Sequence, residues 1–289
     1  MEKIIKEENP FGYKPVGKLL ASMAIPAVVA NLVNALYNIV DQIFIGQGVG
    51  YLGNAATNIA FPITTICLAI GLMMGIGSAA NFNLELGRKN IDRAREVAGT
   101  AVGTLVIIGI LLWITILIFL KPMMVSFGAT EKILDYAMEY TGITSFGVPF
   151  LLFSIGANPL VRADGSPKYS MMAIVVGAIL NTVLDPVFMF VFNMGIAGAA
   201  WATVISEIVS ALLLAYYFTR FKTVKFQLKD FIPKLEFVKV IVSLGIASFI
   251  FQFSTTIIQI TTNNLLKNME VCQFMAAIFQ LQLRELLQK

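Results

Sequence analysis

Residues 97–120 read VAGTAVGTLVIIGILLWITILIFL and contain no charged side chain. A helix needs about 20 predominantly apolar residues to cross the hydrocarbon core of a bilayer, so this segment predicts a membrane-spanning helix. The rest of the chain has the same character. Of its 289 residues 57% are hydrophobic and 13% are charged, whereas soluble proteins carry about 25% charged residues. The composition excludes an ordinary soluble enzyme and predicts a membrane protein.

Six further segments are long and apolar enough to cross a bilayer. The seven predicted spans cover residues 18–46, 54–84, 97–120, 134–161, 169–192, 196–219 and 237–265. We therefore expect an all-α polytopic membrane protein. Membrane helices tolerate proline where neighbouring helices satisfy the freed backbone group, and Pro26, inside the first span, is the predicted hinge.

The basic residues alternate from loop to loop. Sixteen of them lie in the N-terminal segment, after span two, after span four, and between span six and the start of span seven. The opposite loops carry only Lys121 and Lys132. By the positive-inside rule, this distribution predicts a multi-pass protein of the plasma (inner) membrane with a cytoplasmic N-terminus. A patch that binds nucleic acid would not alternate in this way, so we expect no nucleic-acid partner.

The chain has no histidine, which excludes Ser-His-Asp catalysis and His-ligated zinc. Its two cysteines, Cys67 and Cys272, are too far apart in sequence to form a CxxC pair. We therefore expect no enzyme activity and no cofactor.

Ionisable residues inside spans are costly and often functional. The candidates are Asp41, Asp185 and Glu207. Helical spacing puts Asn181 on the face of Asp185, and Thr203 on the face of Glu207. The same spacing gives one stripe on the first span, made of Asn31, Asn34, Asn38 and Asp41. Counting from the span ends puts Asp41, Asp185 and Thr203 at similar depth, so we expect them to converge on one cavity.

Two carboxylates that share a dehydrated site cannot both ionise easily. The pair Asp41 and Asp185 could hold a proton, or share a sodium ion with the oxygens of Asn181 and Thr203. A metal other than sodium is not expected. Further candidates for the cavity or its polar network are Asn34, Tyr37, Asn38 and Glu207. For the asparagines alone, hydrogen bonding between helices is the favoured interpretation.

Span seven resembles span one at an offset of 221 residues, with Lys18 matching Lys239 and Ser22 matching Ser243. This repeat predicts a six-helix lobe followed by the first helix of a second, parallel lobe. The predicted regions are a cytoplasmic segment 1–17, the lobe 18–219, a basic linker 220–236, the helix 237–266 and an atypical tail 267–289. Two full repeats would need a longer chain, so we expect truncation. The alternative is a natural seven-span protein with an amphipathic tail.

The order and spacing of several motifs resemble the multidrug and toxic compound extrusion (MATE) family of transporters. The motifs are Pro26 and Asp41 in span one, VRADGSPK at 161–168, NTVLDP at 181–186 and GIAGAAWAT at 195–203. The resemblance covers about residues 12–266 and stops after about Lys267.

The resemblance implies twelve helices in two lobes around a central cavity. It also implies export of organic cations or drugs in exchange for protons or sodium ions. By motif match, the cation site of the first lobe comprises Asp41, Asn181, Asp185 and Thr203, and Tyr140 and Asn158 join its polar network. Half of the substrate cavity would be missing, so transport would require pairing with a second chain that supplies the other lobe.

Three alternatives stay open. A related lipid-linked oligosaccharide flippase would be expected to carry basic residues in its cavity for pyrophosphate, but the spans hold acids and almost no bases. An intramembrane aspartyl protease would use two aspartates on different helices. The chain could also be an inactive fragment.

Overall fold

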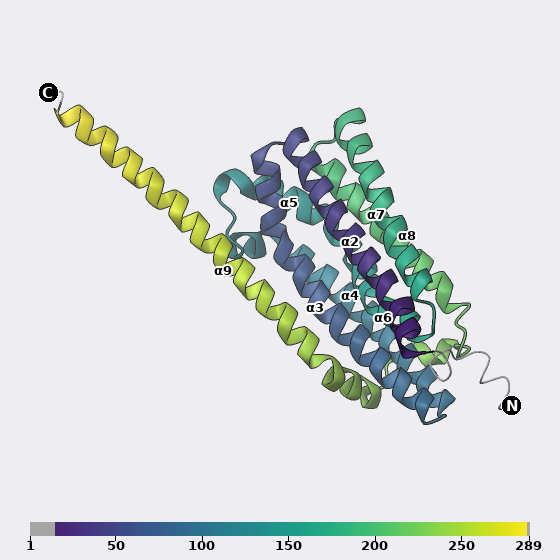
Figure 1. The fold of residues 1–289 in the computed structure, drawn as a ribbon. Helices are drawn as coiled ribbons and strands as arrows, with labels where there is room; N and C mark the ends of the chain where they lie inside the picture. Colours follow the sequence, from purple (N-terminus) through teal and green to yellow (C-terminus); the bar gives the residue numbers. More distant parts are fainter. Residues whose placement is uncertain (1–14, 288–289) are drawn as a thin grey trace.

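The computed structural model describes residues 15–287, and side chains are described as far as Lys267. Predictions for residues 1–14 and 288–289, including most of the N-terminal segment, lie outside the described residues. The described chain is helical and contains no strand. Its long helices are α2 (Val16–Gly48), α3 (Tyr51–Gly87), α4 (Ile91–Ser126), α5 (Glu131–Thr144), α6 (Val148–Ala163), α7 (Pro167–Pro186), α8 (Ile196–Phe218) and α9 (Leu235–Leu287) (Figure 1). Counting α5 with α6 as one segment, seven are long and apolar enough to cross a membrane, which confirms the predicted fold class.

The fourth and fifth spans are not the uniform helices that the sequence predicts. A 3₁₀ turn, η2 (Ser145–Gly147), separates α5 from α6. Pro149 follows this turn and has no N–H to bond to the carbonyl of Ser145, so the regular ladder is interrupted there. Similarly, α7 ends at Pro186 and continues as a π-helical segment, η3 (Val187–Val191). The two breaks make the backbone hydrogen bonding of these spans irregular.

Helix α3 lies at the centre of the packing and crosses α9 at very short range. A Cβ atom added at Gly77 would overlap the Ile241 carbonyl oxygen, and one added at Gly245 would overlap the Met73 carbonyl oxygen. Only glycine lets two helix backbones approach this closely. The Thr256 hydroxyl, on α9, also donates a hydrogen bond to the Thr65 hydroxyl, on α3, at 2.8 Å. Helices α3 and α9 therefore form one closely packed pair.

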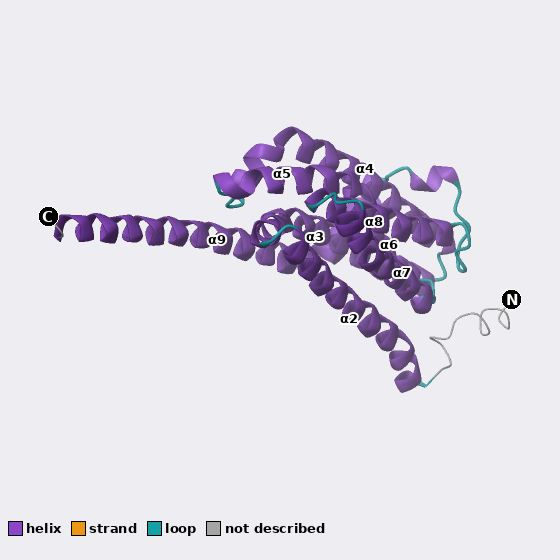
Figure 2. Cartoon of the chain, turned by 90° about the horizontal axis from the view of Figure 1, so that it is seen from above, coloured by secondary structure: helices purple, strands orange, loops and turns teal. Residues whose placement is uncertain are grey.

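Helix α2 is the least covered helix of the lobe. Figure 2 shows its N-terminal half leaning away from the other helices, and most of its large apolar side chains are exposed. Pro26 is buried within it without interrupting the helix, so its role as a hinge stays a prediction. The helix is anchored near its C-terminal end, where Asp41 and Ile45 are buried.

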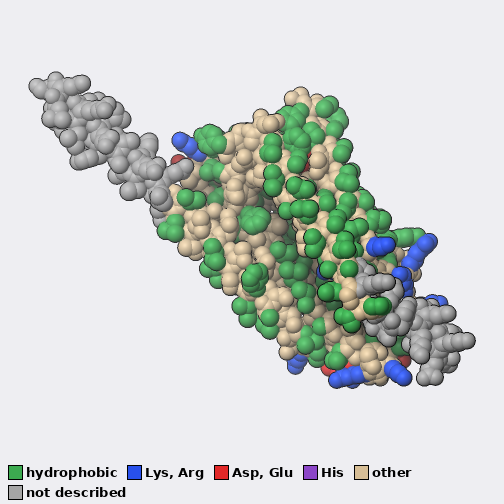
Figure 3. Space-filling view, viewed as in Figure 1, with side chains coloured by type: hydrophobic (Ala, Val, Ile, Leu, Met, Phe, Trp, Pro, Cys, Tyr) green, Lys and Arg blue, Asp and Glu red, His purple; other side chains and the backbone are tan. Residues whose placement is uncertain are grey.

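The surface fits a lipid environment on its flank and water at its ends. Figure 3 shows hydrophobic side chains over the flank of the bundle, with most Lys and Arg of this face near the end that carries the segment between α8 and α9. We call that segment, residues 219–234, the linker. Charges therefore gather where the chain leaves the apolar band.

The linker packs against α4. A Cβ atom at Gly99 or Gly103 would overlap the carbonyl oxygens of Asp230 and Phe231, which lie in the short 3₁₀ helix η4 (Leu228–Phe231). The buried Asp230 carboxylate forms an ion pair with Arg95 at 3.1 Å. The glycines of α4 thus make the notch into which the linker packs.

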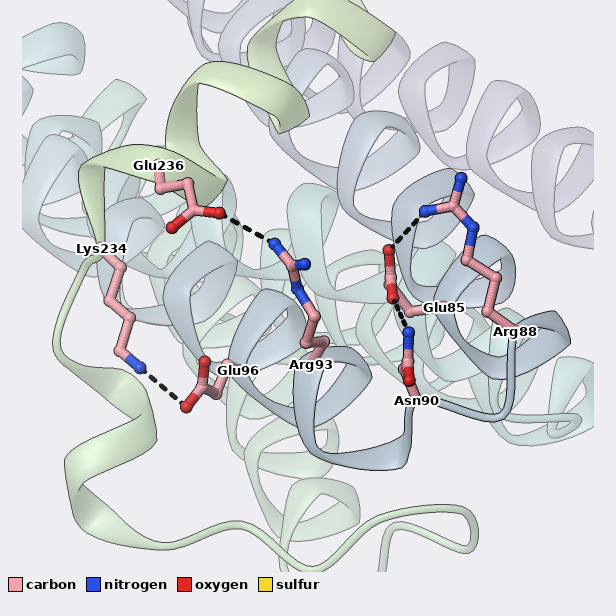
Figure 4. Close-up of polar contacts among 7 residues, drawn as sticks. All are labelled: Glu85, Arg88, Asn90, Arg93, Glu96, Lys234 and Glu236. Carbon is pink, nitrogen blue, oxygen red and sulfur yellow. Dashed lines mark hydrogen bonds and ion pairs between the residues drawn. The ribbon is translucent and has the colours of Figure 1, made fainter.

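Two exposed ion pairs surround this docking site. Arg93 contacts Glu236 at 2.8 Å, and Lys234 contacts Glu96 at 2.7 Å (Figure 4). Both pairs join the start of α4 to the linker or to the first turn of α9. They reinforce the same connection from the solvent side.

Asp164 fastens the other end of the linker. Its buried carboxylate accepts hydrogen bonds from the Tyr217 hydroxyl at 2.7 Å and from the backbone N–H groups of Lys222 and Thr223 at 2.8 and 2.9 Å. The Thr223 hydroxyl donates to it as well. Asp164, in the turn after α6, therefore holds the chain that leaves α8.

Candidate cation-binding site

Two buried aspartates meet between α2 and α7. The Asp41 and Asp185 side chains are 8% and 0% exposed, and their carboxyl groups lie next to each other. Asp41 accepts a hydrogen bond from the Gln42 amide at 3.3 Å, and Asp185 accepts one from the Asn181 amide at 3.4 Å. Each acid is thus hydrogen bonded by a neutral amide of its own helix.

A third helix completes the cluster. The Asn181 amide also donates to the Thr203 hydroxyl of α8 at 3.4 Å, and Tyr140 of α5 lies beside Thr203. The structure therefore brings Asp41, Asn181, Asp185 and Thr203 together.

Helical periodicity explains why α7 presents these groups. Its buried side is a stripe at intervals of three or four residues that includes Gly177, Asn181 and Asp185. The Ser210 side chain of α8 fills the space beside Gly177, which brings the two helices close together. Close packing at the glycine holds Asn181 within reach of Thr203.

Three buried oxygens of the cluster lack a hydrogen-bond partner among the described residues. They are Asp41 Oδ1, Asp185 Oδ2 and Asn181 Oδ1. An unsatisfied buried acceptor costs about 1–3 kcal/mol, more if it is charged. All three are acceptors, and hard cations prefer oxygen ligands. The arrangement is suited to hold a proton or a small cation.

No basic side chain of the described residues pairs with these acids. The ionisable groups near Asp41 are Tyr37 of α2 and Tyr140 of α5, and Glu207 of α8 lies near both tyrosines. All the ion pairs in the described chain lie elsewhere. The described residues also contain no group of three or more Cys, Asp or Glu that could hold a metal ion.

Glu207 lies one helical turn from Thr203 on the same face of α8. Its Oε2 atom sits against Gly147, in the break between α5 and α6, where any side chain would collide with it. Within the described residues its carboxylate forms no hydrogen bond or ion pair. The absence of a side chain at Gly147 thus leaves room for the Glu207 carboxyl group.

Three of the predicted network residues lie outside the cluster. Asn34 and Asn38 are exposed, and the Asn38 amide donates to the Asn34 carbonyl of its own helix at 2.7 Å, so in the described chain they do not bridge helices. Asn158 accepts a hydrogen bond from the Ser170 hydroxyl at 2.6 Å. Ser170 lies 15 residues before Asp185 on α7, which corresponds to about 22 Å along the helix. Asn158 therefore belongs to a separate polar contact between α6 and α7.

Sequence reasoning missed Gln42 and Thr57. The Thr57 hydroxyl of α3 donates to the Gln42 side-chain oxygen at 3.2 Å, and Gln42 also lines an open groove of about 530 Å³ between α2 and α3. The sequence offered little signal, because Gln42 was passed over beside Asp41 and Thr57 lies in a span that has no ionisable residue near it.

Comparison with known proteins finds one family and a consistent set of relatives. The MatE family model matches residues 26–187. The chain is 25% identical over 253 residues to the multidrug export protein MepA of Staphylococcus haemolyticus, covering 85% of this chain and 55% of that protein.

Comparison with solved structures also finds transporters. A MOP superfamily transporter from Pyrococcus furiosus is 30% identical with a TM-score of 0.76, over 82% of this chain and 53% of that one. The inward-facing conformation of a multidrug resistance MATE family transporter is also 30% identical, with a TM-score of 0.73 over 81% of this chain and 55% of that one. The chain spans about half the length of the relatives that it matches.

Proposed function

Because the chain belongs to the MATE family of transporters, we propose that it acts in the export of organic cations or drugs in exchange for protons or sodium ions. The first lobe would supply the site of the coupling ion, at Asp41, Asn181, Asp185 and Thr203. The observation that carries this proposal is the set of buried acceptors that lack donors around a pair of adjacent carboxyl groups.

Coupling follows from competition between two positive ligands. A proton or sodium ion at Asp41 and Asp185 cancels one negative charge of the pair and gives the unpartnered oxygens a positive partner. An organic cation near the ionised pair is stabilised by the same charge, so the two ligands disfavour each other. If each favours a different state of the lobes, exchange results.

The charge distribution supports an orientation. Basic residues gather at the linker end of the bundle, and Asp41 lies toward the other end of α2. With the linker end in the cytoplasm of a plasma-membrane protein, the ion site would lie in the outer half of the bilayer. A proton or sodium ion arriving from outside would then reach the pair over a short distance.

A complete cavity would need a second lobe. This chain covers only 55% of the MepA relative, and α2 presents an exposed apolar face along most of its length. We propose that a second chain supplies the remaining helices when the protein transports. The ion site itself consists of first-lobe residues only, so ion binding does not require that partner.

The test is cation-driven dye efflux from vesicles that contain the 289-residue chain together with a second chain that supplies the remaining helices, with a proton gradient or a sodium gradient imposed separately. Asp41→Asn and Asp185→Asn should each reduce driven efflux by roughly 5- to 150-fold, the size of a typical coupling free energy. Asp135→Asn, at an exposed position on α5, is the matched control and should leave efflux unchanged. Unchanged efflux in both site variants would remove the pair from coupling.

The alternatives predict other results. An aspartyl protease would cleave a membrane peptide, and the same two variants would abolish cleavage. A lipid-linked oligosaccharide flippase would need bases to meet pyrophosphate, whereas only acids and phenols face this cluster among the described residues. An inactive fragment would show no driven efflux in the parent chain or in either variant.

A further inference from the structure

The linker carries basic side chains that no acid of the described residues pairs with. Residues 219–234 contain five basic residues and one acid, Asp230, which is buried and paired with Arg95. Lys234 pairs with Glu96 of α4. The other four basic residues are exposed and form no ion pair within the described chain, and we call them the basic cluster: Arg220, Lys222, Lys225 and Lys229.

The same segment and the first residue of α9 expose large aliphatic side chains. Leu228 is 91% exposed, and Ile232 and Leu235 are 65% and 69% exposed. The aromatic residues of the linker behave differently, because the Phe226 ring packs against the Phe231 ring with a centroid separation of 5.5 Å. One kind of apolar side chain therefore stabilises the linker internally, and the other is left largely uncovered.

The docking of η4 determines which way these side chains point. The carbonyl groups of its last two residues lie against Gly99 and Gly103 of α4. Leu228 and Lys229 form the first half of this short helix and are exposed, so they lie on the side that faces away from α4. A basic and an aliphatic side chain therefore share the outer surface of η4.

The linker docks at a level where α4 is already apolar. Glu96 is the last charged residue before the uncharged stretch 97–120. Gly99 and Gly103 lie beyond it by about 4.5 and 10.5 Å along the helix axis. Helices that lie in a membrane interface bury their apolar face by about 5–10 Å at the boundary between headgroups and acyl chains. The depth of η4 therefore matches this boundary, with Leu228 at the level of the first acyl carbons.

An anionic phospholipid has the chemistry that complements this surface. Its phosphate accepts charge-assisted hydrogen bonds from Lys and Arg, and its acyl chains cover aliphatic side chains. Each Lys or Arg near an anionic bilayer surface strengthens binding by about fivefold. A soluble anion would leave Leu228 uncovered, and so would a nucleic acid, which has no acyl chain to offer.

The lobe holds the start of the basic cluster in place. The Arg220 guanidinium group lies over the Tyr216 ring, 4.9 Å from its centroid. The backbone N–H of Lys222 donates to the buried Asp164 carboxylate at 2.8 Å. Because the backbone is already ordered, binding of a headgroup costs less conformational entropy than it would on a free loop.

We propose that the linker is a binding surface for anionic phospholipid, in which the basic cluster contacts the headgroup phosphates while Leu228 and Ile232 contact the acyl chains. With the orientation proposed above, this lipid belongs to the cytoplasmic leaflet. The inference is independent of the proposed function, because it requires neither the ion site nor a transported molecule.

The experiment is fluorescence quenching of Leu228→Trp in the full chain, in nanodiscs that mix phosphatidylglycerol with phosphatidylcholine, one of the two lipids carrying bromine on its acyl chains. Trp113→Phe and Trp201→Phe remove the native indoles, and if that background is unstable, the difference between Leu228→Trp and the parent chain gives the same signal. Brominated chains should quench the indole at position 228. The ratio of quenching should show that phosphatidylglycerol binds about fivefold or more tightly than phosphatidylcholine.

Matched variants separate the charge from the apolar contact. Glutamine at all four positions of the basic cluster should abolish the preference for phosphatidylglycerol, while quenching by brominated phosphatidylcholine persists. These side chains are exposed, so the fold should be retained. Lys121→Gln with Lys132→Gln, at exposed positions near the other end of the bundle, should leave the preference unchanged. High salt should weaken it in the parent chain.

Any of three results would overturn the inference. An indole at position 228 that brominated chains do not quench would show that the linker lies in water or under another part of a protein. Equal binding of the two lipids would show that the headgroup charge is not recognised. A preference that survives the loss of the basic cluster would assign the attraction to charges elsewhere on the chain.

Discussion

Buried acids occur at both ends of this bundle, and they differ in what satisfies them. At the linker end, Asp164 accepts four hydrogen bonds, from a tyrosine, a threonine and two backbone N–H groups, and Asp230 pairs with Arg95. At the other end, Asp41 and Asp185 face each other, and each keeps one buried oxygen that no described residue satisfies. The same residue type is structural in one place and suited to bind a cation in the other.

The difference has an energetic meaning. Removing a satisfied buried acid leaves its donors without an acceptor, which destabilises the fold. Removing an acid that has no compensating base relieves a desolvation cost. Variants at the two ends should therefore change stability in opposite directions, and thermal unfolding of the purified chain measures this directly.

The largest effect is expected at Asp164. Asp164→Ala should lower the free energy of unfolding by about 3–5 kcal/mol, because the N–H groups of Lys222 and Thr223 and the Tyr217 hydroxyl lose a buried acceptor. Asp135→Ala, at an exposed site, is the control and should change it little. A chain as stable as the parent after Asp164→Ala would contradict the structural role.

The second-largest loss of stability is expected at Arg95. Arg95→Ala leaves the buried Asp230 carboxylate without its base and should cost about 2 kcal/mol. Arg95→Lys keeps the charge and should retain part of that stability. Equal losses in the two variants would show that packing of the arginine, not its charge, holds the linker.

At the pair of Asp41 and Asp185, we expect the change in the free energy of unfolding to have the opposite sign. Asp185→Asn removes one of two adjacent unpaired acids while its side-chain oxygen can still accept from Asn181, so we expect unchanged stability or a gain of about 1 kcal/mol. The same unfolding assay measures it. A loss comparable to that of Asp164→Ala would erase the distinction between the two ends.

The smallest effect should come from an exposed ion pair. Arg93 and Glu236 side chains are 54% and 71% exposed, so Arg93→Ala should change the free energy of unfolding by about 0.5 kcal/mol or less. Glu236→Ala should match it within that range. A loss above about 1 kcal/mol would mean that surface pairs contribute to linker docking far more than exposed pairs normally do.

Hydropathy predicted the number of spans, because each must present enough apolar residues to cross the lipid core whatever its packing. The meeting of Asp41, Asp185 and Thr203 was also predictable, since depth follows from counting residues along helices. The breaks within the helices were not predicted. The contact between Glu207 and Gly147, in the 3₁₀ turn, is visible only in the structure.

Contacts between segments that are far apart in the sequence were also not predicted. Asp164 lies in a motif that the sequence singles out, but its partners are backbone N–H groups of Lys222 and Thr223, which no side-chain pattern reveals. The docking of Asp230 against Gly99 depends on a missing side chain, so there was no positive signal to find. The exposed Asn34 and Asn38 show that periodicity identifies a face without showing what covers it.

The crossing of α3 and α9 bears on how such chains can be divided. If α9 opens a second repeat, as its likeness to α2 predicts, the boundary in sequence precedes Leu235, yet Gly77 and Gly245 bind the helix backbone to backbone onto the first lobe. The unit that moves as one body would then include seven helices rather than six. A split-protein design that separates the halves should cut after Lys267. An earlier cut would remove part of α9, which packs against α3, from the first lobe.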